Sequence, residues 1–396
     1  MNGDILKHFY KRGQDNIFME NLRLSSQNIY RIIEKLKMEK VFCISLVLSI
    51  FTSFFANPKI SYINFKVIVL LFNLMIIISA LKELKFMDKI AVIVLSKCKN
   101  TRMISLIFIL ITFFASMLVT NDVALLTFVP LAMLTFKKVK FDPMKTIILQ
   151  TLAANIGSSL TPMGNPQNLF LFTHYNLSSF QFFSITIPFV IIGMFWLILL
   201  NIRIPKKNLQ LCIENVDIED KKRTSIYLII FLIVIFSVFG IVNYKYTFLI
   251  VIIGVFLMDK HLIKEVDYFL LFTFICFFVF IGNISSIKSI QAYLNNFLQI
   301  KDMPYFSSIV FSQFISNVPC SVLLAGFTKN WKEVLLGVNI GGMGTLIASL
   351  ASLISYKIFI NENEDKKNKL YLSKFNIYSF VSLFLFTIAN YIYIHL

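Results

Sequence analysis

The sequence predicts an all-α polytopic membrane protein built from two inverted repeats, each with a re-entrant helical hairpin and a broken transmembrane helix. Three observations predict this fold: apolar residues occur in long blocks, basic residues gather between the blocks, and a polar hairpin tip followed by a helix break occurs twice. Of the 396 residues, 57% are hydrophobic and 15% are charged, whereas soluble domains average about 25% charged residues. The nearly uncharged blocks run about 17–22 residues, enough to cross about 30 Å of hydrocarbon as helices. They include Val41–Asn57, Phe65–Leu81, Phe180–Asn201, Ser225–Val242 and Ile377–Ile394.

The first forty residues form a basic N-terminal tail that we expect in the cytoplasm. Basic residues beside a span favour the cytoplasmic side, and lysines and arginines are frequent here. Residues 29–38 place four aliphatic side chains on one helical face, which fits an interfacial helix on the cytoplasmic leaflet. A simply tethered tail fits equally well. The tail is too long and too charged for a cleavable signal peptide, so we expect a multi-pass protein of the cytoplasmic (plasma) membrane.

The first repeat, residues 41–201, contains a predicted hairpin. Apolar arms at residues 103–119 and 123–136 flank a polar tip, Thr120-Asn121-Asp122, and basic residues lie beyond both arms. The second arm, about 14 residues, measures about 21 Å, which is short of a full crossing. The segment is therefore expected to enter and leave on the cytoplasmic side, with its tip near the middle of the membrane. Two short spans are the alternative.

A broken helix follows the first hairpin at residues 146–172. Its centre, Asn155–Asn168, contains two prolines, which remove backbone donors, and two flexible glycines. Non-helical backbone at membrane depth survives only where it is buried in protein or lines a wet cavity. We expect the break to line such a cavity; an ordinary external loop is the alternative.

The second repeat, residues 246–396, follows a cytoplasmic link and connecting span at residues 202–245. Its hairpin, residues 304–327, has Ser316-Asn317 at the tip, and its broken helix, residues 331–357, is interrupted by a glycine-rich stretch. Asn-Ile-Gly follows the tip in both halves, at residues 155–157 and 339–341. The connecting span makes the second copy start outside, so the copies have opposite orientations. Inverted repeats with discontinuous helices are typical of alternating-access transporters.

The polar patches at the hairpin tips and helix breaks form the candidate solute and ion site. Helix N-termini favour anions, while exposed carbonyls and helix C-terminal ends suit Na⁺. We expect Na⁺ near Asn121, Asp122 and Asn317. The full candidate set is Thr120, Asn121, Asp122, Asn155, Gly157, Thr161, Pro162, Gly164, Asn165, Asn168, Ser316, Asn317, Pro319, Asn339, Gly341, Gly342 and Thr345.

Asp122 is the only acid well inside either hairpin. A central Asp costs about 2.5–3.5 kcal/mol to insert, and such residues usually face a cavity and bind a cation or a proton. We expect Asp122 to couple transport to Na⁺ or H⁺. A helix cap is the alternative, with the carboxylate on the free amides of residues 123–125, and the two roles can coexist.

Other functional classes lack their sequence signals. The chain has no Ser/His/Asp set, no metal-ligand spacing, no Walker loop and no CxxC pair. We therefore expect no enzyme and no cofactor. The net charge of +17 comes from lysines and arginines gathered between apolar runs, without the interleaved aromatics of nucleic-acid binding. The expected partners are a small anionic solute and the lipid bilayer, with no nucleic acid.

The motifs resemble the ion transporter superfamily, which includes arsenite permeases, one type of Na⁺/H⁺ antiporter, and citrate or dicarboxylate/sulfate carriers. The resemblance lies in residues 120–130, 154–168 and 316–319, and it covers about residues 41–394. It implies two inverted repeats, a homodimer with a scaffold and a mobile transport domain, and contact of Asn121 and Asn317 with ion or solute from opposite sides. The dicarboxylate branch typically has Ser-Asn-Thr at both tips. The tips here, Thr-Asn-Asp and Ser-Asn-Val, lean toward the arsenite-permease side.

The sequence thus predicts a secondary transporter that moves a small anion or oxyanion by alternating access, coupled to Na⁺ or H⁺. One alternative is a Na⁺/H⁺ antiporter on the same fold, with Asp122 carrying the exchanged ion. A more distant alternative is a channel-like or structural membrane protein.

Overall fold

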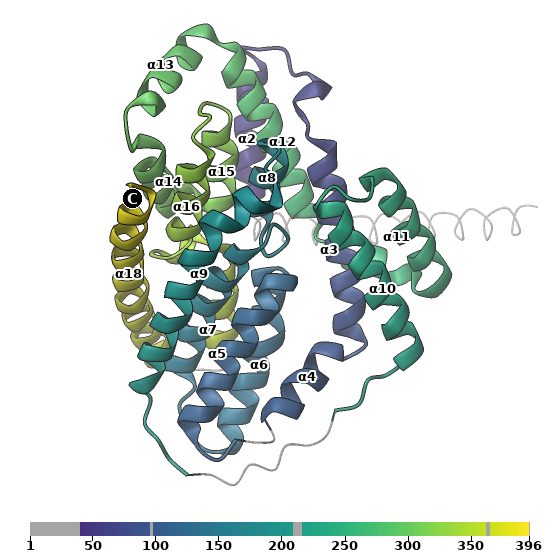
Figure 1. Cartoon of the computed structure of the whole chain (residues 1–396), viewed down its shortest axis with the longest axis vertical. Coiled ribbons are helices and arrows are strands. Elements are labelled where there is room, and N and C mark those ends of the chain that lie inside the picture. Colours follow the sequence, from purple (N-terminus) through teal and green to yellow (C-terminus); the bar gives the residue numbers. More distant parts are fainter. Residues whose placement is uncertain (1–39, 96–97, 209–215, 362–364, 396) are drawn as a thin grey trace, which may run out of the picture.

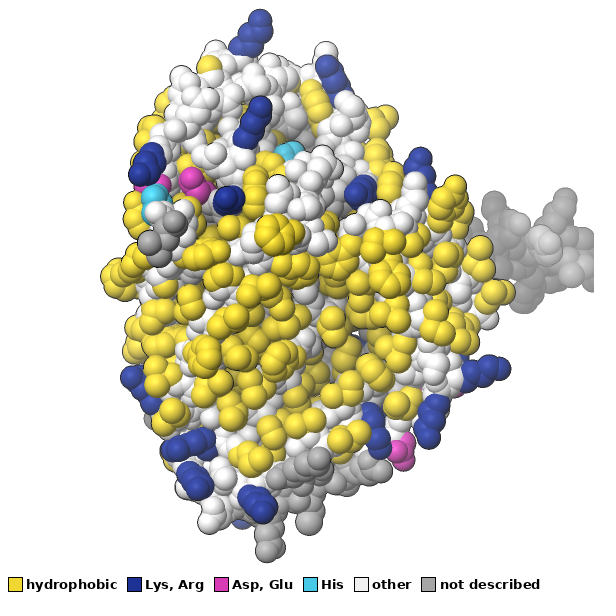
Figure 2. Space-filling view, in the orientation of Figure 1, with side chains coloured by type: hydrophobic (Ala, Val, Ile, Leu, Met, Phe, Trp, Pro, Cys, Tyr) yellow, Lys and Arg dark blue, Asp and Glu magenta, His cyan; other side chains and the backbone are white. Residues whose placement is uncertain are grey.

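The computed structural model describes residues 40–95, 98–208, 216–361 and 365–395 (Figure 1). Every regular element in these ranges is a helix, and one isolated bridge pairs Asn100 with Asn208. Figure 2 shows a broad band of hydrophobic side chains across the middle of the face in view, with lysines and arginines mostly toward its two ends. Five described helices are long and apolar enough to cross a membrane: Phe65–Glu83, Thr101–Leu118, Ser179–Ile202, Tyr268–Ser286 and Lys367–His395. The predicted all-α polytopic membrane fold is confirmed, while the N-terminal tail and its candidate interfacial helix lie outside the described residues.

The first half begins in the predicted order, with one added helix. Helices α2 (Lys40–Ser53) and α3 (Phe65–Glu83) match the first two spans. The basic link that follows contains α4 (Phe86–Leu95), which the charge pattern did not predict. The first hairpin consists of α5 (Thr101–Leu118) and α6 (Asn121–Lys138).

The second arm of the first hairpin is longer than the sequence suggested. Helix α6 has 18 residues, because it begins at Asn121 and continues through Lys137 and Lys138. The expected length of about 14 residues was wrong, since the polar residues at both ends are helical. The arm measures about 27 Å, so its length no longer argues for re-entry, and α5 is also long enough to cross.

The predicted first helix break is present. Helix α7 (Met144–Gly157) passes into a short 3-10 turn, η2 (Ser158–Leu160), and the chain becomes helical again in α8 (Pro166–His174). Pro166 occupies the first helical position, where its missing N–H costs no helical hydrogen bond. Asn165 caps α8 by accepting a hydrogen bond from the Asn168 amide at 2.9 Å. The half closes with α9, Ser179–Ile202.

The second half opens with three helices at the predicted spans and one unpredicted helix. The spans are α10 (Lys221–Val238), α11 (Tyr244–Met258) and α12 (Tyr268–Ser286). The unpredicted α13 (Lys288–Gln299) joins α12 to the second hairpin. Figure 1 shows α4 toward one end of the molecule and α13 at the other.

The second hairpin and second break also match their predictions. The hairpin arms, α14 (Met303–Ile315) and α15 (Asn317–Ala325), are short, and they meet at Ser316. The broken helix consists of α16, Trp331–Gly341, then η4, Leu346–Ala348, and α17, Leu350–Asn361. Helix α18 spans Asp365–His395 and includes the last predicted crossing, Ile377–Ile394.

The helices pack as two groups. In the first, which we call the α3 group, α10 and α11 pack on α3, and α2 packs on α12. In the second, which we call the α7 group, both hairpins, both broken helices, α9 and α18 pack around one another. Helices α4 and α13 connect the groups, and α8 and α15 face α3 and α12 across the boundary. This boundary positions the cavities described below.

We predict that both hairpins are re-entrant, since their flanks carry same-side signals and Figure 1 shows α5 and α6 toward one end and α14 and α15 toward the other. Single cysteines in a background without native cysteines should label from the cytoplasm at residues 137–140 and from outside at residues 301–303. Cysteines at 121 and 317 should react only in some transport states. Free reaction at either tip under all conditions would contradict the prediction.

Candidate functional site

The first copy of the repeated tripeptide Asn-Ile-Gly, at residues 155–157, contains Asn155, which lies at the centre of a hydrogen-bond cluster. The Asn121 Nδ2 donates to Asn155 Oδ1 at 3.3 Å, and the Ser349 hydroxyl donates to the same oxygen at 3.0 Å. The Asn155 Nδ2 donates to Gly342 O at 3.4 Å. Asn155 thus links the first hairpin tip to the helix break of the other half.

Asn339 makes the reciprocal connection from the second half. Its Oδ1 accepts from the Ser159 hydroxyl at 3.0 Å and from Asn165 Nδ2 at 3.2 Å. Its Nδ2 donates to Asn168 Oδ1 at 2.8 Å. All four side chains are buried. Each broken helix therefore carries an asparagine that binds the break of the other, and the predicted amides do converge.

Two glycines allow equivalent close approaches of hairpin and broken helix. A Cβ at Gly157 would collide with Phe113 O and lie 2.6 Å from Ser116 Oγ. A Cβ at Gly341 would lie 2.7 Å from Ser312 Oγ. Ser116 and Ser312 each lie five residues before the tip asparagine of their hairpin. Small residues let helix backbones approach closely in membranes.

The two break threonines also have matching roles. The Thr161 hydroxyl donates to Met117 O, and the Thr345 hydroxyl donates to Gln313 O at 3.0 Å. Met117 and Gln313 both lie four residues before a tip asparagine. These hydroxyls tie the breaks to the hairpins. The matching contacts support two repeats, while their inverted orientation stays a prediction.

Gln313 is a site residue that the sequence analysis missed. Its Nε2 donates to Gly341 O at 2.8 Å and to Met343 O at 3.1 Å, and its Oε1 accepts from the Thr345 amide at 2.9 Å. It satisfies backbone groups that the break leaves without helical partners. Its signal was available, because it is the one amide side chain in the α14 arm.

Some predicted residues shape the site without meeting each other. No hydrogen bond joins Asn121 to Asn317 in the described part of the chain. The Asn317 Nδ2 lies against Gly342, where an added Cβ would be 2.8 Å away. The Ser316 hydroxyl donates to Ala348 O at 3.4 Å. Three further candidates are buried at the break and the hairpin tip: Pro162, Gly164 and Pro319.

A cavity of about 770 Å³ leads from the two basic links that begin at Lys82 and Lys357, which the charge pattern predicts on the cytoplasmic side, to the first hairpin tip. We call it the inner cavity, after the side on which those links are predicted to lie. Near the links, the cavity is lined by Lys82, Glu265 and Lys357. Near the first hairpin tip and the first helix break, it is lined by Thr120, Asp122 and Pro166. The cavity lies between the α3 group and the α7 group. Four carboxylates and two lysines are among its lining residues, Glu83, Asp122, Glu265, Asp267, Lys82 and Lys357.

Asp122 lies in this cavity with an unpartnered oxygen. Thr120 occupies the N-cap position of α6 without a side-chain capping hydrogen bond, and Asp122 is the second residue of the helix. Its Oδ1 is buried and has no hydrogen-bond partner among the described residues. The alternative of a capping carboxylate on residues 123–125 is therefore not what the structure contains. The N-termini of α6 and α8, at Asn121 and Pro166, adjoin the same end of the cavity.

At the mouth of the inner cavity a histidine pairs with a lining carboxylate. The His261 Nε2 lies 2.6 Å from Glu83 Oε2. This hydrogen bond raises the pKa of His261, and exposure of both side chains to water limits the strength of the pair. Asp267, also at the mouth, accepts from the Leu270 amide at 3.0 Å and caps α12.

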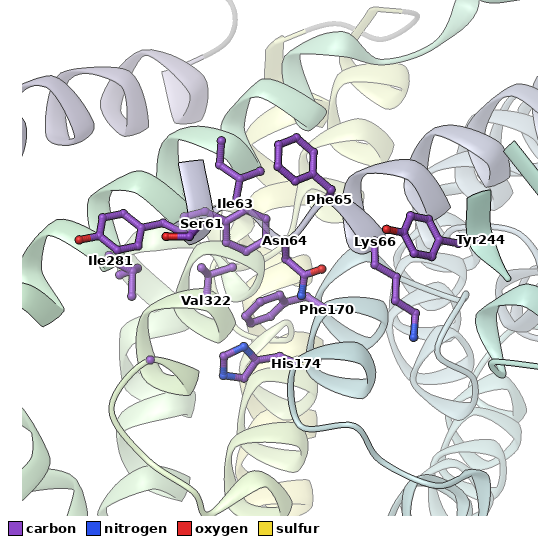
Figure 3. Close-up of a pocket in the computed structure, with 14 residues that line it drawn as sticks. Ser61, Ile63, Asn64, Phe65, Lys66, Phe170, His174, Tyr244, Ile281 and Val322 are labelled. Atoms are coloured by element: carbon purple, nitrogen blue, oxygen red, sulfur yellow. The ribbon is translucent and has the colours of Figure 1, made fainter. Parts of the chain in front are cut away.

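A second cavity, of about 590 Å³, lies at the opposite end of the same group boundary (Figure 3). We call it the outer cavity. It is lined by the start of α3, by α8, α12 and α15, and by Tyr244. Pro166 lines the inner cavity and Phe170 the outer one. These residues are one helical turn apart, about 6 Å, so the partition between the cavities is thin along α8.

Comparison with known proteins finds membrane transporters among the relatives of this chain. A family model described as citrate transporter matches residues 29–331. An uncharacterized transporter of Methanocaldococcus jannaschii is 41% identical over 299 residues, 75% of this chain and 81% of that protein. The inner membrane protein YbiR of Escherichia coli is 28% identical over 318 residues, 80% of this chain and 85% of that protein. The putative transporter arsB of Dictyostelium discoideum is 31% identical over 134 residues, 34% of this chain and 24% of that protein. With its helix breaks, its cavities and these relatives, the chain is a membrane transporter and not an enzyme, and it belongs to the citrate transporter family.

Proposed function

We propose that this protein is a secondary active permease for a small anion or oxyanion, coupled to Na⁺ or H⁺. One observation carries the proposal: Asp122 lines the inner cavity beside the N-termini of two helices. Helix N-termini favour anions, and a membrane-embedded carboxylate favours a cation or proton. The site therefore suits two ligands of opposite charge.

The same geometry supplies a reason for coupling. An ionised Asp122 repels an anion that approaches the start of α6, and low dielectric strengthens that repulsion. A proton or Na⁺ at the free Oδ1 of Asp122 removes the repulsion, so that the N-termini of α6 and α8 attract the anion. Anion binding is thus favoured only when the coupling ion is bound, and the linkage is reciprocal.

Alternating access is supported by the two cavities at one boundary. Asp122 lines the inner cavity, while Phe170 and Phe278, whose ring centroids lie 5.6 Å apart, line the outer cavity. A shift of the α7 group against the α3 group would open the site to the outer cavity and close the inner one. The proposal includes the cytoplasmic membrane as the location, a cytoplasmic N-terminus and a homodimer.

A Na⁺/H⁺ antiporter is the second candidate function, and the unpartnered Asp122 Oδ1 favours it. A single carboxylate that binds Na⁺ and H⁺ in turn can exchange them without any anion. The two candidates differ in whether cation movement requires an anion.

Reconstituted vesicles distinguish the candidates. Purified protein is tested for uptake of labelled citrate, sulfate and phosphate under imposed Na⁺ or proton gradients, with a pH-sensitive dye inside. The proposal expects saturable, gradient-driven uptake of an anion. Na⁺-driven proton movement without any anion would instead identify an antiporter, and gradient-independent, non-saturable flux would identify a channel.

A further inference from the structure

The outer cavity differs in charge from the inner one. Among the residues that line it in the described part of the chain there is no Asp or Glu, and Lys66 is its one lysine or arginine. The inner cavity, by contrast, is lined by four carboxylates and two lysines. An anion is therefore favoured electrostatically in the outer cavity and disfavoured at the inner mouth.

Lys66 stands at an unusual place for a cation. It is the second residue of α3, whose first turn carries no acidic side chain. A cation in the first turn of a helix opposes the helix dipole. Lys66 is half-buried and forms no ion pair with the residues described here. The positive end of the α3 dipole and the positive charge of the Lys66 ammonium therefore act on the same cavity, and no described acidic side chain pairs with the ammonium.

The backbone beside Lys66 adds a free donor. Asn64 caps α3 by accepting from the Val67 amide at 3.3 Å, and the Ile68 amide bonds to Asn64 O. The Lys66 amide forms no hydrogen bond with any described residue outside its helix. An anion at the start of α3 can accept from this amide and pair with the ammonium.

Contacts between the other helices that line the cavity hold its walls together. The His174 Nε2 donates to Ala325 O at 3.2 Å, which ties α8 to the end of α15. The ring of Phe170 lies between His174 and Phe278, with centroid distances of 5.1 Å and 5.6 Å. Figure 3 shows Lys66, Asn64, Phe170 and His174 around this space. Phe170 and Phe278 thus line the cavity where α8 continues to Pro166 and the inner cavity.

We propose that the outer cavity is an anion-binding vestibule, in which Lys66 and the N-terminus of α3 hold a small anion before it reaches the site at Asp122. The inference rests on the proposed anion permease and adds a second anion site to it. The ligand class is a small inorganic or carboxylate anion. The vestibule raises the local anion concentration on the outer side of Phe170 and Phe278. Loss of the vestibule site should therefore raise the KM of transport more than it lowers kcat.

Charge-selective labelling tests the vestibule without any transport. A single cysteine, Ser61→Cys, is placed at the cavity in a background without native cysteines. In an uncharged detergent, this cysteine is modified separately by an anionic reagent, sulfonatoethyl methanethiosulfonate, and by a cationic one, trimethylammonioethyl methanethiosulfonate. The charge ratio is the rate with the anion divided by the rate with the cation. Lys66→Gln should lower this ratio by about threefold at low ionic strength, and high salt should remove the difference. Lys66→Arg should retain the wild-type ratio, which excludes a folding defect at this position.

Lys59→Gln is the matched control, because Lys59 precedes η1 (Ile60–Tyr62) on the same loop but does not line the cavity. It should leave the ratio near the wild-type value. An equal effect of Lys59→Gln and Lys66→Gln on this ratio would overturn the proposal, since the electrostatic potential at the cysteine would then come from surface lysines in general and not from the cavity.

Binding is tested with uncharged methyl methanethiosulfonate at the same cysteine. Sodium citrate or sodium sulfate should slow its reaction relative to sodium chloride at equal ionic strength, and Lys66→Gln should abolish this protection. Equal rates in all three salts would overturn the vestibule even if the charge ratio changes. Because labelling needs no transport, these outcomes are separate from failure of the proposed function, which appears only in vesicles.

Discussion

Asp122→Asn should give a folded protein whose transport no longer depends on a Na⁺ or proton gradient. Its Oδ1 makes no hydrogen bond with the described residues, so the amide should cost less than about 1 kcal/mol of stability. The amide cannot bind a proton at neutral pH and carries no charge to attract Na⁺. In vesicles, the variant should lose at least about tenfold in gradient-driven uptake, equivalent to about 1.4 kcal/mol of coupling.

Asp267→Asn is the matched control for this prediction. Asp267 lines the same cavity and caps α12 through its Oδ1, and Asn is an equally good capping residue. Asp267→Asn should therefore keep stability and the dependence on a gradient, but the pH dependence of uptake should shift, because the Asp267 charge acts on the Asp122 carboxyl. If Asp122→Asn instead transports at the wild-type rate with the wild-type gradient dependence, the coupling ion must be bound by backbone carbonyls and the asparagines.

Gly157→Ala should destabilise the protein and strongly reduce transport. The added methyl would collide with the backbone carbonyl of Phe113 and approach Ser116 Oγ, so α5 and α7 must separate. Overpacking of this kind costs about 1–3 kcal/mol, and a backbone neighbour cannot rotate away. The measurement is the apparent Tm in detergent together with uptake in vesicles.

Gly341→Ala should show the same defect to a smaller degree, because its nearest neighbours are side-chain atoms of Ser312. Gly254→Ala is the control, since its added methyl would meet only the flexible ends of two side chains, Ile230 at 3.0 Å and Met258 at 3.9 Å. A Tm in Gly157→Ala equal to that in Gly254→Ala would show that the hairpin is not packed as described.

The sequence by itself determined the fold class and the location of both breaks. Long apolar blocks must be helices in a bilayer, because only helices or closed barrels satisfy every backbone group there. Proline and glycine between residues 157 and 166, and glycines at 341–344, disrupt helices through local chemistry alone. Such local effects can be read without knowing the neighbours. The tip asparagines and Asp122 were found for the same reason, since polar residues stand out within apolar runs.

Only the tertiary structure decided which of these groups meet and what each one does. Sequence spacing could not show that Asn155 bonds to the second break or Asn339 to the first. It also left open whether Asp122 caps α6 or faces the cavity, because both roles suit an acid at a helix start. The answer depends on long-range packing: Thr120 occupies the N-cap position without a side-chain capping hydrogen bond, and the Asp122 carboxylate lines the cavity between the two helix groups.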